Sequence, residues 1–229
     1  FQFLLLLISA LVFSQEKEIE FLIPSIQSDI TIDGVGNEKE WGKSDWQSEF
    51  WLWRPNDSLK ANKQTRFKVL KNEKNLYVFI ELFTDGIKFS TPSLKRDFDT
   101  FGAEAITLLF DTFNDGTNAF SFTTNPLGLK KEGLISGGNQ NYRTDRNYSW
   151  DTKWFVESKI YDNRYTVEIQ IPLTSLFYNS SSDFWRFNIY RGNAQNNEYS
   201  VWAKTPLNQT IGNLGFMGKM VFETPLKKA

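Results

Sequence analysis

The side chains that could do chemistry in this chain are chiefly carboxylates and aromatic rings, because its 229 residues include neither histidine nor cysteine. Without histidine there is no Ser-His-Asp or Cys-His arrangement and no histidine ligand for haem or another metal. Without cysteine there are no zinc–thiolate sites, iron–sulfur clusters or disulfides. Carboxylate catalysis, a cation held by oxygen ligands, and binding through aromatic surfaces remain possible.

Paired carboxylates would indicate a glycosidase, which needs two of them about 5–10 Å apart. The chain has 27 acidic and 26 basic residues. The candidates are Glu81, Asp85, Asp97, Asp99, Glu104, Asp111 and Glu168. Their spacing singles out no pair, so we expect this chain not to be an enzyme. The net charge of −1 also offers no basic surface to nucleic acid.

An oxygen-rich segment follows an expected strand that ends at Asp111. Asn114 and Asp115 lie close behind it in sequence, and Gly116 permits a tight turn. Asp111, Asn114 and Asp115 could supply oxygens to Ca²⁺, although the twelve-residue spacing of a calcium loop is absent. The pattern favours a turn in which these side chains bond to nearby backbone N–H groups, and a calcium site is the alternative.

Aromatic residues are unusually frequent, since 21 Phe, 8 Trp and 8 Tyr make up 16% of the chain. Flat rings stack on the C–H faces of sugars, and many exported β-sandwiches combine them with planar polar groups to hold saccharides. Most phenylalanines are nonetheless expected in the core. Those assigned to it from their apolar runs and strand faces are Phe67, Phe79, Phe120 and Phe122.

A long polar segment at 137–154 carries three aromatic residues among glycines, amides and charged side chains. Long loops of this composition are common places for ligand-binding residues. Tyr142, Arg143, Tyr148 and Trp150 are therefore predicted to bind a ligand. The alternative is a solvated connector that one tryptophan anchors.

Alternation of apolar and polar residues, clearest at 165–171, predicts an all-β protein, and no long stretch has helical periodicity. A hairpin is predicted over 65–83, and its run at 76–83 is apolar on both faces except at Glu81, which predicts a covered central strand. We expect a two-sheet antiparallel β-sandwich, jelly-roll-like, of about ten strands in one domain over 25–223. Further strands are predicted at 30–32, 105–111, 119–124, 154–160, 185–191, 198–202 and 219–222, with short helical turns at 37–43 and 174–177.

Residues 1–13 are uncharged and almost entirely apolar. They are too few to span a bilayer, which takes about 20 residues. Residues 1–14 are instead typical of a secretory signal peptide, with cleavage after Ser14 and a mature start at Gln15. The alternative is a buried strand. Because no basic segment precedes the apolar run, we expect the sequence to be cut at its start.

Several stretches of the chain resemble family 9 carbohydrate-binding modules. Ile32-Asp33-Gly34 followed by Glu40-Trp41 is similar to the opening of these modules, and the similarity covers about residues 28–223. Other stretches resemble one branch, exported proteins of Gram-negative bacteria in which such a module precedes a domain thought to form an outer-membrane β-barrel. They are Arg96-Asp97, Asp111-Thr112-Phe113-Asn114-Asp115, Asn125-Pro126-Leu127-Gly128, Trp150-Asp151 with Trp154, Glu168-Ile169-Gln170-Ile171-Pro172, Asn188 with Arg191, and Glu198 with Trp202.

The resemblance implies a β-sandwich, export to the periplasm or outer membrane, and carbohydrate binding. It also implies that the chain continues, so that residues 224–229 begin a missing C-terminal region. Family members that bind haem use His or Met ligands. Only Met217 and Met220 are present here, both near the last expected strand, so we expect no haem.

The resemblance also locates the sugar site of the family. In sugar-binding members two tryptophans clamp a sugar ring, and Glu and Arg bond its hydroxyls. The matching positions here are Phe101 and, approximately, Ile211 for the tryptophans, with Thr107 and Thr123 in place of Glu and Arg. This exchange should weaken or abolish that mode of binding, because charge-assisted hydrogen bonds are the stronger ones.

Together these observations predict an exported carbohydrate-binding module of a larger outer-membrane or periplasmic protein, with an oligo- or polysaccharide as partner and no cofactor. Phe101 joins Tyr142, Arg143, Tyr148 and Trp150 as predicted ligand-binding residues. One alternative is a structural plug or docking domain of a β-barrel encoded downstream in the same chain. Another is an accessory module of a glycoside hydrolase, in which case the full-length protein would have O-glycosyl hydrolase activity.

Overall fold

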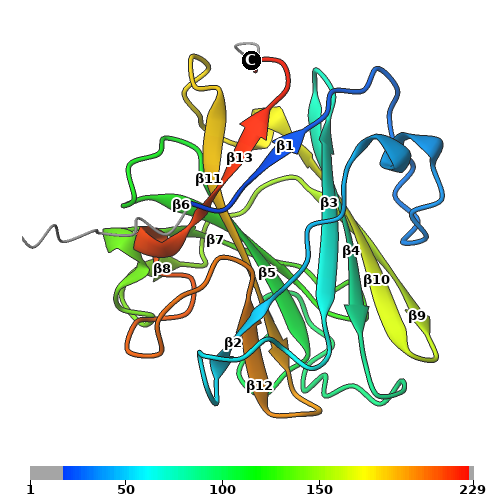
Figure 1. Ribbon diagram of the computed structural model, residues 1–229, viewed down its shortest axis with the longest axis vertical. Coiled ribbons are helices and arrows are strands. Elements are labelled where there is room, and N and C mark those ends of the chain that lie inside the picture. Colours follow the sequence, from blue (N-terminus) through cyan, green and yellow to red (C-terminus); the bar gives the residue numbers. More distant parts are fainter. Residues whose placement is uncertain (1–17, 227–229) are drawn as a thin grey trace, which may run out of the picture.

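The computed structural model describes residues 18–226 (Figure 1). Strands dominate these residues and form two sheets that pack face to face. The expected all-β sandwich is therefore confirmed, with thirteen strands instead of about ten. The predicted signal peptide and the last residues of the predicted tail lie outside the described residues. Within 18–226, no helix is both long and apolar enough to cross a membrane.

One sheet contains nine strands. They are β1 (Glu20–Ile23), β2 (Trp51–Arg54), β5 (Ala105–Asp111), β6 (Ala119–Thr124), β7 (Lys131–Ile135), β8 (Arg146–Asn147), β11 (Phe184–Asn193), β12 (Glu198–Val201) and β13 (Gly218–Phe222). The main order is β1-β13-β11-β5-β6-β7-β8, and β12 lies between the second half of β11 and β2. Every pair is antiparallel except β1 with β13.

The other sheet contains four strands, β3 (Thr65–Lys71), β4 (Asn75–Phe83), β9 (Phe155–Tyr161) and β10 (Arg164–Pro172). Their order is β3-β4-β10-β9, antiparallel throughout. The predicted hairpin is confirmed as β3 and β4. Its turn is closed by Asn72, whose Oδ1 accepts the N–H groups of Lys74 and Asn75 at 2.9 and 2.8 Å. Strand β4 is buried along its length except at Phe83, as its two apolar faces predicted.

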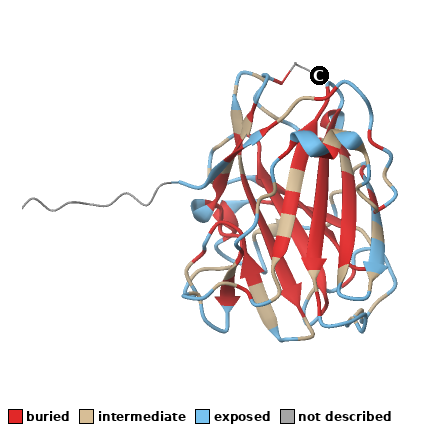
Figure 2. Ribbon diagram, turned by 45° about the vertical axis from the view of Figure 1, so that its right-hand side comes forward, coloured by how far each residue is buried: buried red, intermediate tan, exposed pale blue. Residues whose placement is uncertain are grey.

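The main hydrophobic core lies between the two sheets (Figure 2). Along β5 the side chains of Ile106, Leu108 and Phe110 belong to it, whereas Leu109 lies in a second cluster on the opposite face of the sheet. Burying a side chain of this size contributes about 1.5–3 kcal/mol. The phenylalanines assigned to the core are all buried, namely Phe67, Phe79, Phe120 and Phe122.

The prediction of a strand at 30–32 is wrong. This segment lies over the outer face of the four-stranded sheet, where Ile30 and Trp41 join a separate apolar cluster. The N–H groups of Asp33 and Gly34 donate to the Glu168 carboxylate instead of to a neighbouring strand. A side chain therefore satisfies the backbone donors that strand pairing would have used.

Strands β1, β2, β7 and β8 were not predicted. In β7 the buried Lys131 and Glu132 interrupt any apolar alternation. Both have internal partners: Lys131 donates to the Phe98 carbonyl at 3.1 Å, and Glu132 accepts the Trp154 indole N–H at 3.0 Å. The two predicted helical turns are present as short 3-10 helices. The four such helices are η1 (Lys39–Lys43), η2 (Gly137–Asn139), η3 (Leu173–Ser175) and η4 (Leu214–Phe216).

Glu168 on β10 ties the segment before η1 to the four-stranded sheet. Its carboxylate accepts the N–H groups of Asp33 at 3.0 Å and Gly34 at 2.8 Å, and the indole N–H of Trp41 at 3.0 Å. The side chain is completely buried. Burial raises the pKa of Glu168 to about 7, because desolvation of the charged form, together with repulsion from Glu38, outweighs these three donors.

This carboxyl should make the stability of the protein depend on pH. Between its ordinary pKa of 4.5 and about 7, folded Glu168 keeps a proton that the unfolded chain has released. We therefore expect the free energy of unfolding to fall by on the order of 3 kcal/mol as the pH rises through this window, and to level off above it. Urea unfolding of the protein and of Glu168→Gln across the same window isolates the contribution, and an unchanged slope in the variant would contradict it.

Candidate functional site

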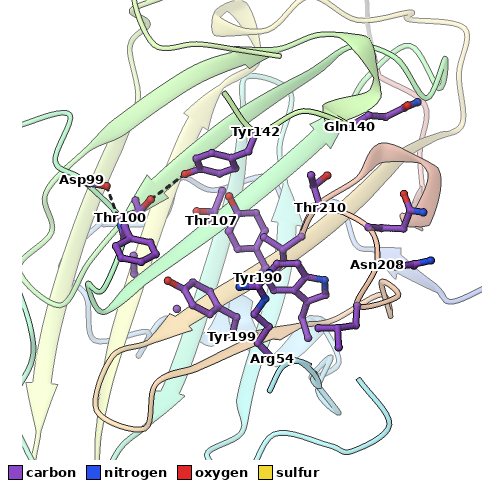
Figure 3. A pocket seen from close by; sticks show the side chains of 17 residues that line it. Arg54, Asp99, Thr100, Thr107, Gln140, Tyr142, Tyr190, Tyr199, Asn208 and Thr210 are labelled. Atoms are coloured by element: carbon purple, nitrogen blue, oxygen red, sulfur yellow. Dashed lines mark hydrogen bonds between the residues drawn. The ribbon is translucent and has the colours of Figure 1, made fainter. Parts of the chain in front are cut away.

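A cavity of about 520 Å³ lies on the outer face of the nine-stranded sheet (Figure 3). Four adjacent strands contribute side chains to it: Thr107 from β5, Tyr190 from β11, Tyr199 from β12 and Trp53 from β2. Three loops complete its lining, at 99–101, 140–142 and 207–211. We call this site the tyrosine cavity, after Tyr142, Tyr190 and Tyr199.

The rings of Trp53 and Tyr199 meet edge to face in the cavity, with centroids 6.2 Å apart and planes at 89°. The Trp53 indole N–H donates to the Pro206 carbonyl at 3.3 Å, which fixes the ring. Gly192 lies opposite Tyr199 on the paired strand. A Cβ at Gly192 would come within 3.3 Å of the Tyr199 ring. Because glycine has no side chain, the ring can lie over this position of the sheet.

Phe101 is the most exposed ring of the cavity, at 82%. Its loop is held by Asp99, whose Oδ1 accepts the Phe101 N–H at 3.0 Å. Tyr142 is 43% exposed, and its hydroxyl lies 3.3 Å from that of Thr100, so the two loops are joined (Figure 3). Large rings left open to water at one place indicate a contact surface for a ligand.

The polar groups of the cavity are almost all neutral. The amide and hydroxyl side chains at its rim are Gln140, Asn208, Gln209 and Thr210. Thr107 lies with its hydroxyl 2.8 Å from that of Thr123. Arg54 and Asp99 are the only charged residues among the described residues that line the cavity. Rings combined with amides and hydroxyls suit an uncharged ligand that has both apolar faces and hydroxyl groups.

Arg146 lies outside the lining of the tyrosine cavity and supports the residues that form its walls. Its Nη1 donates to the hydroxyls of Tyr190 at 3.0 Å and Tyr148 at 3.3 Å, and its Nε donates to Asn139 Oδ1 at 3.0 Å. Its guanidinium carbon lies 4.2 Å from the ring centre of Tyr142. One side chain therefore positions two of the three tyrosines of the cavity.

Asn139, in η2, anchors the loop at 207–211. The residue is completely buried and has a φ of 56°, in the left-handed region that asparagine tolerates. Its Nδ2 donates to the Gly212 carbonyl at 2.9 Å, and its own carbonyl accepts the Thr210 hydroxyl. Arg146 and Asn139 thus connect the strand wall of the cavity to its loop wall.

The structure brings together two of the five residues that were predicted to bind a ligand. Phe101 and Tyr142 line the tyrosine cavity. Tyr148 lies behind it, in the group that contacts the supporting arginine. Trp150 lines a different cavity. Arg143 is exposed and lines neither cavity.

Trp53, Tyr190 and Tyr199 line the cavity but were not among the predicted residues. Tyr190 and Tyr199 did fall in predicted strands. The missing information was the register that pairs Gly192 with Tyr199 and Tyr190 with Val201, because it decides which rings share a face. The positions that the resemblance matched to a sugar clamp lie close together here. Of these, Phe101, Thr107 and Ile211 line the cavity, and Thr123 bonds to Thr107.

The oxygen-rich segment after β5 forms a turn of the favoured kind. Asp111 accepts the N–H groups of Asp115 at 3.3 Å and Gly116 at 2.8 Å, and Asn114 Oδ1 accepts the Arg186 N–H at 2.9 Å. Asp111 therefore serves the backbone of the turn, and Asn114 ties the turn to β11. Among residues 18–226 there is no group of three or more His, Cys, Asp or Glu residues that could hold a metal ion.

The fold is similar to several solved structures. A candidate carbohydrate-binding protein from Bacteroides uniformis superposes with a TM-score of 0.69 at 10% identity, covering 90% of this chain and 100% of that chain. A family 9 carbohydrate-binding module from Caldicellulosiruptor kristjanssonii in complex with cellotriose gives 0.60 at 12% identity, with 92% and 95% covered. A module of the same family and organism in complex with glucose gives 0.61 at 13%, with 91% and 98% covered. At these identities the similarity concerns the fold alone.

Sequence comparison with the curated proteins finds no match. The sequence model of one family, described as carbohydrate family 9 binding domain-like, matches residues 32–221. This match spans both sheets and the cavity between the loops at 99–101 and 207–211. The chain therefore belongs to the carbohydrate family 9 binding domain-like family.

Proposed function

We propose that this chain binds a saccharide in the tyrosine cavity. The observation that carries the proposal is the combination of aromatic walls with a neutral polar rim. Tyr199, Trp53 and Phe101 offer flat apolar surfaces, while Gln140 and Asn208 offer amide groups. A pyranose ring has the matching surfaces, since its C–H faces stack on rings and its hydroxyls bond to amides.

We propose an uncharged, glucose-containing oligosaccharide as the ligand class. Two similar structures hold cellotriose and glucose, which supports this choice. By the family resemblance, Thr107 and Thr123 match the positions at which sugar-binding members carry Glu and Arg. Binding would then rely on stacking and on neutral hydrogen bonds, which are about half as strong as charge-assisted ones, and the affinity should be modest.

Binding without cleavage is part of the proposal. Glycoside hydrolysis uses two carboxyl groups on either side of the scissile bond. Asp99 is the only acidic residue among the described residues that line the tyrosine cavity, and its Oδ1 already accepts the Phe101 N–H. The cavity thus offers a surface for holding a sugar and lacks a second acid to break it.

We further propose that the module is exported and acts within a larger periplasmic or outer-membrane protein. The apolar run at 1–13, with a candidate cleavage site after Ser14, supports export. The resemblance to exported modular proteins supports the larger context. N-terminal sequencing of the natural protein tests the export, with Gln15 expected as the first residue, and a mature protein that retains residues 1–14 would contradict it.

Isothermal titration of the chain against glucose, cellotriose and a panel of neutral oligosaccharides tests the binding. We expect saturable heat with at least one sugar and a change in tryptophan fluorescence, because Trp53 lines the cavity. Acidic oligosaccharides of the same length serve as the matched comparison and should bind no better. Neither heat nor a fluorescence change with any sugar of the panel would overturn the proposed function.

A further inference from the structure

A second cavity, of about 420 Å³, lies at the edge of the nine-stranded sheet. Strands β6, β7 and β8 contribute to its lining, together with Trp150 and with loops that carry Phe113 and Phe177. We call it the Trp150 cavity. Its volume falls in the range of about 300–1,000 Å³ that small-molecule sites usually have.

Packing holds Trp150 and Phe120, two of the aromatic residues that line this cavity. Trp150 packs on Phe120 with centroids 5.2 Å apart, and on Phe122 at 6.2 Å. The loops that carry Phe113 and Phe177 are joined because the Thr112 hydroxyl, next to Phe113, donates to the Phe177 carbonyl at 2.5 Å. Trp150 and the two joined loops therefore need little ordering when a ligand binds, which favours affinity.

Two of these rings are strongly exposed. Phe113 is 50% exposed and Phe177 is 73% exposed, from two loops about 60 residues apart in sequence that meet at one cavity. Single exposed apolar residues are ordinary on a protein surface, but contiguous ones at a cavity mark an interaction site. Trp150 and Phe120 line the same cavity, so four aromatic rings line the space that a ligand would enter.

The remaining groups of the cavity indicate the chemistry of the ligand. None of the described residues that line it is charged. Asn147 uses its Oδ1 to accept the Ser149 N–H at 2.9 Å, which leaves its Nδ2 amide available to a ligand. Ser136 adds an exposed hydroxyl. Rings, an amide and a hydroxyl with no charge match an uncharged saccharide, whose C–H faces stack on rings and whose hydroxyls bond to neutral polar groups.

We propose that the Trp150 cavity is a second saccharide subsite, separate from the tyrosine cavity. The proposal takes only the ligand class from the proposed function. Ser136 lines the Trp150 cavity and Gln140 lines the tyrosine cavity, so the two sites are separated in the chain by η2 alone. One polysaccharide can engage both sites, whereas a short oligosaccharide occupies one at a time.

Two linked subsites predict a specific pattern of affinity. After one site has bound a polymer, binding at the other is intramolecular, and avidity can exceed either single affinity by about 10²–10⁴. Disabling the Trp150 cavity should therefore reduce polymer binding strongly and leave oligosaccharide binding at the tyrosine cavity unchanged. Disabling the tyrosine cavity should reduce both.

An array of oligosaccharides and the polysaccharides of the same repeating units, cellotriose and cellulose among them, tests this pattern with the full chain. Phe177→Ser disables the Trp150 cavity at an exposed position, and Phe113→Ser is an independent second variant. Leu94→Ser is the matched control, since Leu94 is also 73% exposed and lies outside both cavities. We expect Phe177→Ser and Phe113→Ser to lose about tenfold or more in polymer affinity and the control to lose none.

The outcomes separate the two proposals. Polymer binding by Phe177→Ser and Phe113→Ser that equals that of the unmodified chain overturns the second subsite and leaves the proposed function standing. No binding of any glycan by the unmodified chain overturns both. If the chain forms a dimer that Phe177→Ser dissolves, a second copy occupies the cavity and the saccharide assignment is wrong. Thermal unfolding of each variant verifies that it is folded.

Discussion

Replacing Arg191 with methionine is expected to lower the free energy of unfolding by about 3–5 kcal/mol. Arg191 and Glu104 form an ion pair in which both side chains have no solvent exposure. Arg191 Nε and Nη2 donate to Glu104 Oε1 at 2.9 and 2.7 Å, and Nη1 donates to the Phe83 carbonyl at 2.9 Å. The variant would leave the Glu104 carboxylate buried without its cation.

The position of this ion pair in the fold explains why its loss should lower the stability of the whole domain. Glu104 directly precedes β5 and Arg191 lies in β11, both in the nine-stranded sheet, whereas Phe83 ends β4 in the other sheet. Tyr165 of β10 also donates to Glu104 Oε1, at 3.2 Å. One network thus joins the two sheets. Its loss should lower the stability of both sheets together and should not be confined to the pairing of one strand.

Urea unfolding measures the loss, and two comparisons isolate its cause. The double variant Arg191→Met with Glu104→Leu should recover part of the stability, because it leaves no buried charge unpaired. Lys63→Met removes the partly exposed ion pair with Asp85 and should cost less than about 1 kcal/mol. A loss of similar size for Arg191→Met and Lys63→Met would contradict the assignment.

Replacing Tyr199 with alanine is expected to weaken saccharide binding by about tenfold to a hundredfold, or about 1.5–3 kcal/mol. The Tyr199 ring lies edge to face with Trp53 and beside Gly192, so it forms a wall of the tyrosine cavity. Its removal takes away a stacking surface together with the edge-to-face contact to Trp53.

Titration of the best ligand from the oligosaccharide panel measures this effect. Tyr199→Phe keeps the ring and should bind nearly as well as the unmodified chain. Tyr161→Ala is the matched control, because Tyr161 ends β9 in the four-stranded sheet, away from the tyrosine cavity. If Tyr199→Ala bound as tightly as Tyr161→Ala, the ligand would lie elsewhere on the molecule.

Local patterns, alternation in β3 and β10 and a run that is apolar on both faces in β4, identified several of the strands. The hairpin of β3 and β4 and the strands β5, β6 and β10 lie where their patterns placed them. The same reasoning failed where a side chain replaced a backbone partner, as Glu168 does for Asp33 and Gly34, and where buried charges have internal partners, as Lys131 does in β7. In each case the hydrogen-bond partner is a residue distant in sequence, which the local pattern of apolar and polar residues does not reveal.

The residues of the candidate site were also predicted only in part from the sequence. The composition of the segment at 137–154 pointed to Tyr142 and the family resemblance pointed to Phe101, and both line the tyrosine cavity. The composition of that segment also pointed to Trp150, whose ring packs on Phe120 at the second cavity. Exposure of an aromatic residue in a polar loop depends on the surfaces that the loop meets after folding, and those surfaces come from distant strands.

The sequence by itself determined the all-β class, and the missing His and Cys by themselves removed thiolate and imidazole chemistry. Only the tertiary structure decided where a ligand can bind. Trp53, Tyr190 and Tyr199 become one wall through the pairing of β2, β12 and β11, and Arg146 holds that wall from behind. The period of two along a strand tells which side chains share a face, but the partner and the register of each strand are set by contacts across the whole chain.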